Sequence, residues 1–117
     1  MSMALRRDVS RAARAAGNGK PVDLVHLSSQ TLGDPELERE VLGVFLNHAQ
    51  VYLDTWKAAG NANARKRAAH ALKGAARSIG AWELAEMAEK AEGKDFPARA
   101  KLETEMHRVC DYIRSLD

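Results

Sequence analysis

The residues best suited to chemistry in this sequence lie between positions 66 and 77. In a helix of about 3.6 residues per turn, His70 shares one face with four of them, namely Lys66, Lys73, Gly74 and Arg77. Imidazole is a nucleophile at neutral pH, and cations one turn before and after it would attract an anionic group. Gly74 costs about 1 kcal/mol relative to Ala in a helix interior, which favours a functional reason for its presence. This face therefore predicts an exposed nucleophile in an anion-binding surround.

The opposite face of the same segment is apolar and predicts burial. It consists of Ala68, Leu72, Ala75, Ala76 and Ile79. A surface histidine on such an amphipathic helix usually has no function, and cations alone would form an ordinary solvated face. What distinguishes His70 is the fixed spacing of Leu72, Lys73 and Gly74 after it, together with Gly80, which is expected to close the helix.

These residues resemble a known family. The run from His70 to Gly74, followed by Gly80, is similar to the phosphotransfer helix of histidine-containing phosphotransfer (HPt) domains. These domains are small helical bundles that relay phosphoryl groups between receiver aspartates in two-component signalling. The resemblance extends to the segments 34–45 and 84–92 and covers roughly residues 20 to 116. Ala75 is a departure, because the family often has a hydroxyl residue there.

The resemblance implies a role for each residue of this face. His70 would be phosphorylated on Nε2, which requires that Nδ1 carry the proton and be held. Lys73 and Arg77, with Lys66 and Gly74, would bind the phosphoryl group and the receiver.

A carboxylate on the next helix is the expected partner of the histidine. His70 lies ten residues before Gly80 and Glu92 lies twelve after it. In an antiparallel hairpin with a rise of about 1.5 Å per residue, the two return to a similar height. Glu92 also matches the position where the family sets an amide or carboxylate against its histidine. We assign Glu92 the orienting role, with Glu89 as the second candidate.

Helical periodicity predicts an all-α fold, an antiparallel four-helix bundle with an additional N-terminal helix and a short cover helix. The four bundle helices are expected over residues 34–59, 63–78, 82–92 and 95–116, the last capped by Asp95. The cover helix is expected between Asp23 and Gly33, and the N-terminal helix over residues 3–16. The sequence thus divides into a basic N-terminal extension, residues 1–19, and an HPt-like bundle, residues 20–117. His48 falls on the apolar stripe of its helix, which predicts a core or boundary position.

The composition indicates in which cellular compartment the protein is expected. The 117 residues suit one domain, and the single cysteine, Cys110, excludes an internal disulfide framework and fits a reducing environment. No apolar run approaches the roughly 20 residues of a membrane span, and the N-terminus has no apolar signal core. We expect a cytoplasmic protein, a monomer without membrane contact.

The charge distribution and the motifs limit which classes of ligand and partner are expected. The net charge is +2, but residues 21–117 carry 13 basic and 15 acidic residues, and no stacking aromatics accompany the cations. Nucleic-acid binding is therefore the weakest interpretation. The pairs Asp23 with His26 and Glu103 with His107 are too few for a metal site, so no metal is expected. No phosphate-binding glycine loop is present, which argues against autonomous kinase activity and against any cofactor of the protein's own.

The resulting hypothesis is a phosphorelay intermediate. His70 would accept a phosphoryl group from a receiver aspartate or a hybrid sensor histidine kinase and pass it to another receiver, with Mg²⁺ held by the partner receiver. It would be a covalent carrier rather than an enzyme with turnover of its own. The alternative is a non-catalytic helical adaptor that binds a receiver or kinase without phosphotransfer.

Overall fold

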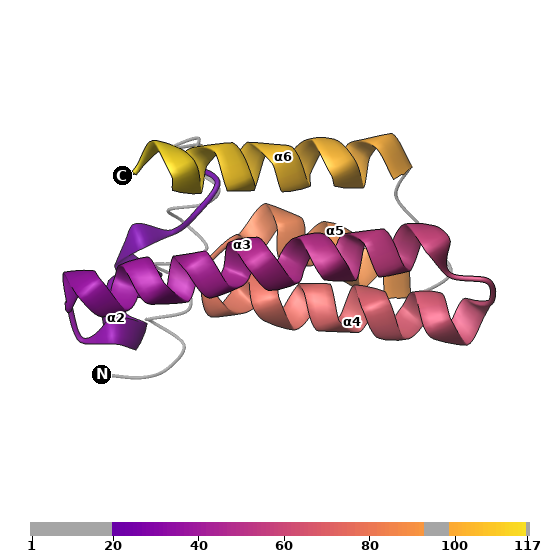
Figure 1. The fold of residues 1–117 in the computed structure, drawn as a ribbon, viewed down its shortest axis with the longest axis horizontal. Helices are drawn as coiled ribbons and strands as arrows, with labels where there is room; N and C mark the ends of the chain where they lie inside the picture. The colour runs from indigo at the N-terminus through magenta and orange to yellow at the C-terminus, as the bar shows by residue number, and fades with distance from the viewer. Residues whose placement is uncertain (1–19, 93–98, 117) are drawn as a thin grey trace.

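The computed structural model describes residues 20–92 and 99–116 of the chain. Within these ranges there are five helices and no strand: α2 (Leu24–Thr31), α3 (Pro35–Ala58), α4 (Ala62–Ser78), α5 (Trp82–Glu92) and α6 (Arg99–Ser115). Successive helices from α3 to α6 run in alternate directions, and α2 lies across one end (Figure 1). The expected all-α bundle with a short cover helix is confirmed. The predicted helix over residues 3–16 and the cap at Asp95 fall outside the described residues.

Each of the first three described helices begins at a polar side chain that binds free backbone N–H groups. Asp23 accepts from Val25 and His26, and Asp34 accepts from Glu36 and Leu37. Asn61 accepts from the N–H of Ala64 at 2.9 Å and starts α4. Such caps stabilise a helix start because the first N–H groups have no partner within the helix.

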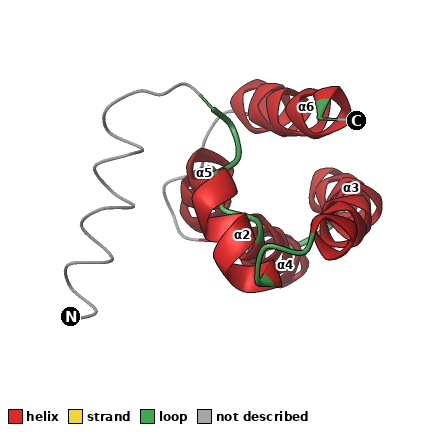
Figure 2. Cartoon of the chain, turned by 90° about the vertical axis from the view of Figure 1, so that its left-hand side faces the viewer, coloured by secondary structure: helices red, strands yellow, loops and turns green. Residues whose placement is uncertain are grey.

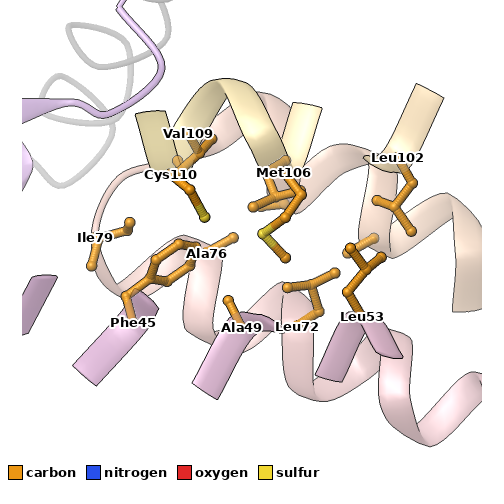
Figure 3. Packing of buried hydrophobic residues seen from close by; sticks show 14 of the residues in the cluster. Phe45, Ala49, Leu53, Leu72, Ala76, Ile79, Leu102, Met106, Val109 and Cys110 are labelled. Atoms are coloured by element: carbon orange, nitrogen blue, oxygen red, sulfur yellow. The ribbon is translucent and has the colours of Figure 1, made fainter. Parts of the chain in front are cut away.

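The core lies between α3, α4, α5 and α6 and fixes the orientation of α4. Phe45, Ala49 and Leu53 of α3 meet Leu72 and Ala76 of α4 beneath side chains of α6 (Figure 3). Cys110 of α6 is also buried in this core, at 4% exposure. The buried faces of α4 and α5 are rich in alanine, whose small side chain permits close approach of neighbouring helices; these residues are Ala68, Ala69, Ala76, Ala85, Ala88 and Ala91. Since the apolar face of α4 is committed to this core, its opposite face must point to solvent.

Gly80 makes the turn that brings α5 back along α4. Its φ is +78°, and a Cβ there would lie 2.9 Å from the Cβ of Asp23 and 3.0 Å from its carbonyl oxygen. Asp23 donates its N–H to the carbonyl of Gly80, and Trp82 Nε1 donates to the Asp23 carboxylate. A side chain at position 80 would therefore be both strained and obstructed, and α2 is tied to the α4–α5 turn.

The expectation for His48 was wrong, because its side chain is exposed. On the same side of α3, Leu37, Val44 and Val51 are 39%, 53% and 58% exposed. In the end-on view, α3 has α4 on one side and α6 on the other, and no other described helix covers its outer surface (Figure 2). The apolar stripe of α3 is thus wider than the part that the bundle buries.

Among the described helices, none combines the length and the apolar composition that crossing a bilayer requires.

Candidate functional site

His70 lies in the middle of α4 on its solvent face, and 70% of its side chain is exposed. Lys66 is exposed one turn before it, and Gly74 is exposed one turn after it. A Cβ built on Gly74 meets no heavy atom within 4 Å, so the space beside the imidazole is open. The ring can therefore be reached by a partner molecule.

The carboxylate of Glu92 holds the inner nitrogen of this ring. Nδ1 of His70 lies 2.5 Å from Oε1 of Glu92, the last residue of α5. The Glu92 side chain is only 13% exposed, whereas the imidazole is mostly in solvent. An ionised carboxylate can only accept a hydrogen bond, so Nδ1 is the donor, and in the neutral ring Nε2 keeps its lone pair. The contact therefore selects the tautomer that a nucleophilic Nε2 requires.

Lys73 binds the second oxygen of the same carboxylate. Its Nζ lies 2.6 Å from Oε2 of Glu92, and its side chain is 14% exposed. Partial burial of the carboxyl group raises the pKa of Glu92, but hydrogen bonds and charge from Lys73 and His70 outweigh this and lower the pKa overall. Glu92 is thus ionised at neutral pH, and its two oxygens contact the histidine and the neighbouring lysine.

Glu89, one turn earlier on α5, lies beside the cations rather than the histidine. Its Oε1 is 3.5 Å from Nη2 of Arg77 and 4.0 Å from Nζ of Lys73. Both Arg77 and Glu89 are about half exposed, at 52% and 57%. The structure therefore brings Glu92 to His70 and gives Glu89, the second candidate for the orienting role, a different set of contacts. We call Lys73, Arg77, Glu89 and Glu92 the charge cluster.

A groove next to this face was not predicted from the sequence. It has a volume of about 660 Å³ and lies between α3 and the C-terminal half of α4. Its lining is mainly apolar and consists of Leu37, Glu40, Val41, Val44, Phe45, His48, Tyr52, Ala75 and Ser78. Its α4 residues, Ala75 and Ser78, lie about one to two turns beyond His70, so the groove runs along the α3 side of the helix that carries the histidine. The sequence did carry a signal for it. The apolar residues 37, 41, 44 and 51, with His48 among them, extend the apolar stripe of this helix beyond the width that one buried face needs.

In the ranges that the structure describes, no three His, Cys, Asp or Glu side chains are grouped so that they could hold a metal ion.

The fold and the site together define a class of protein: a small helical bundle that presents one oriented, exposed histidine on a helix face. The Hpt domain family model matches residues 40–116, a range that contains His70 and the whole charge cluster. The chain therefore belongs to the HPt domain family and has a histidine phosphotransfer role in two-component signalling. Searches of curated proteins and of solved structures found no match to the chain.

Proposed function

We propose that His70 is the phosphoryl carrier of this domain and that it exchanges the group with the aspartyl phosphate of a receiver. The observation that carries the proposal is the 2.5 Å contact between Nδ1 of His70 and Glu92, which leaves Nε2 free on a side chain that is 70% exposed. A hybrid sensor histidine kinase and its receivers are the expected partners. The domain would act as a monomer in the cytoplasm.

The transfer step uses the Nε2 lone pair. As the N–P bond forms, the O–P bond of the aspartyl phosphate breaks, and its electron pair leaves with the aspartate carboxylate. Nδ1 keeps its proton, so the phosphorylated ring becomes an imidazolium. Glu92 would stabilise that positive charge through the contact it already makes, as the buried Asp does for the imidazolium of a catalytic triad. In the reverse direction the same atoms return the group to a second receiver.

The surrounding residues would position the phosphoryl group. Arg77 and Lys66 are exposed cations on the His70 face, and Lys73 lies within the charge cluster. Phosphoryl transfer depends mainly on in-line positioning and charge stabilisation, and Gly74 leaves the room that both require. Mg²⁺ would be held by the acidic pocket of the receiver, and the domain itself would need no cofactor.

The groove between α3 and α4 is the expected docking surface for the receiver. It runs along the α3 side of the helix that carries His70, and Val44 on its wall is 53% exposed. An apolar surface of this kind stabilises a complex when it is covered, whereas charges around its edge mainly steer the encounter. A receiver that covers the groove would also bring its aspartate to His70.

The test is covalent labelling. The full chain, mixed with a phosphorylated cognate receiver, should take up one phosphoryl group that is stable to base and labile to acid. His70→Gln should abolish uptake, and His107→Gln, which removes an exposed histidine of α6, should not. Circular dichroism should report equal helical content for all three. Label retained by His70→Gln would exclude His70 as carrier, and receiver binding without label in the native chain would favour the adaptor alternative.

A further inference from the structure

Two of the cations next to His70 are already paired with carboxylates of the domain itself. Lys73 lies 2.6 Å from Glu92, and Arg77 lies 3.5 Å from Glu89. Within the charge cluster, two positive side chains therefore face two carboxylates, and the cluster is neutral when all four are ionised. A phosphoryl group that arrives on Nε2 brings a charge of about −1.5 to −2 to this neutral cluster.

We propose that Glu89 is a positioning residue that sets how the phosphoryl group is shared between His70 and the receiver. The inference builds on the proposed function and adds a residue that acts through Arg77 and Lys73 rather than on the reacting atoms. In the free domain, Glu89 pairs with Arg77 at 3.5 Å and lies 4.0 Å from Lys73. In the phosphorylated domain, its carboxylate competes with the phosphoryl oxygens for them. Glu89 therefore raises the free energy of the phosphorylated state and favours donation to a receiver.

Glu89 is suited to this role because its contacts are weak and exposed. Its distances to Arg77 and Lys73 are 3.5 Å and 4.0 Å, and its side chain is 57% exposed. An exposed pair of this geometry contributes little to folding, so the carboxylate can be removed without loss of the fold. Glu92 cannot serve the same purpose, because it is nearly buried and holds Nδ1 of His70.

The direction of the effect follows from charge. When His70 donates, its N–P bond breaks, an O–P bond forms on the receiver aspartate, and Nε2 recovers its lone pair. Removing the Glu89 carboxylate leaves the receiver and the contact between Lys73 and Glu92 unchanged. It frees Arg77 to bind the phosphoryl group on His70 and removes a negative charge 4.0 Å from Lys73. The equilibrium should therefore shift towards phosphohistidine, by roughly 3- to 10-fold for one charge at these partly screened distances.

The experiment measures the equilibrium partition of labelled phosphate between the receiver and the full chain, for the native protein and Glu89→Gln. Glu103→Gln is the matched control, since it also removes one negative charge. Glu103 forms an ion pair of 3.4 Å with Lys57, near the C-terminal end of α3, and is not part of the charge cluster. We expect more phosphohistidine in Glu89→Gln, a native partition in Glu103→Gln, and a smaller difference at high salt. In an Arg77→Gln background, the effect of Glu89→Gln should shrink.

The outcomes separate this inference from the proposed function. If His70 takes up label but its partition is unchanged in Glu89→Gln, or changes equally in Glu103→Gln, the inference is wrong and the carrier role stands. A shift that is insensitive to both salt and Arg77→Gln also overturns it. If no variant takes up label, the proposed function itself fails.

Discussion

Lys73 donates to one oxygen of the Glu92 carboxylate at 2.6 Å, while His70 contacts the other oxygen of the same group at 2.5 Å. The lysine that follows the histidine by one turn is thus bound to the residue that orients the histidine. A group near the end of α5 thereby sets the position of two side chains on α4. Any change at Glu92 must affect the histidine and the lysine together.

Glu92→Gln should separate the charge of this residue from its shape. The amide oxygen can still accept from Nδ1, but it cannot neutralise the imidazolium of the phosphorylated ring or pair with Lys73. We expect phosphotransfer to slow by about 10-fold or more, by analogy with loss of a single electrostatic contact in other sites. Single-turnover transfer from a phosphorylated receiver, measured at one salt concentration, checks this.

The same variant has a defined pH dependence of stability. The pKa of Glu92 is lowered in the fold. Its ionised carboxylate therefore adds to the free energy of unfolding above pH 4.5, the ordinary glutamate pKa, and this stabilisation is lost as pH falls through the pKa in the folded state. The free energy of unfolding of Glu92→Gln should therefore be lower than native at pH 7, by about 1 kcal/mol, and should approach native at pH 3. Denaturant unfolding at the two pH values measures the difference.

Glu105 provides the matched control for pH. Burial raises the pKa of Glu105 in the fold, and the charge and hydrogen bond of Arg108 only partly offset that effect. The stabilisation that Glu105 gives the fold is therefore present below the ordinary glutamate pKa and is lost as pH rises through its pKa in the folded state. Glu105→Gln should accordingly become less damaging as pH rises, the opposite of Glu92→Gln. Parallel trends in the two variants would contradict the opposite shifts at the two sites.

The helices could be predicted from the sequence because local signals agree with the packing. Asp34 and Asn61 begin α3 and α4, and Gly80 ends the turn before α5. The meeting of His70 with Glu92 was also predictable, since residue counting along an antiparallel hairpin fixes their heights. Both inferences depend only on repeat geometry.

The pairing of charges and the exposed groove could not be predicted in this way. Arg77 and Lys73 were expected to be available for phosphate, but their distances to Glu89 and Glu92 depend on side-chain conformations that spacing does not determine. His48 was expected near the core because it continues an apolar stripe. How much of that stripe is buried depends on where α4 and α6 lie beside α3, and this is a tertiary property.

The groove gives a prediction about docking. Val44→Glu introduces a charge on an exposed apolar wall, so it should weaken receiver binding and slow transfer at low receiver concentration. Because Val44 is 53% exposed, the free energy of unfolding should change by no more than about 0.5 kcal/mol. Val25→Glu is the control, since Val25 is 82% exposed on α2 and does not line the groove. Equal transfer rates in the two variants, measured across receiver concentrations, would exclude the groove as the docking surface.

Substitutions at Gly74 should affect stability and phosphotransfer differently. It is helical, and a Cβ there would meet no atom within 4 Å beyond its own helix backbone, so none of the described helices packs against it. Gly74→Ala should therefore stabilise the fold by about 0.5–1 kcal/mol, because alanine restricts the unfolded chain more than glycine does. Gly43→Ala is a matched control, since Gly43 lies within α3 and is equally unobstructed. Denaturant midpoints should rise in both variants.

A longer side chain should distinguish the two glycines. Position 74 lies about 40° around the helix and one turn beyond His70, and a helical side chain leans towards the preceding turn. Gly74→Gln would therefore extend over the imidazole and occupy the space that a phosphoryl group and a receiver loop need. We expect it to fold at least as stably as the native chain but to lose most phosphotransfer, whereas Gly43→Gln should keep full transfer. A destabilised or fully active Gly74→Gln would show that the open space beside His70 is not what the glycine provides.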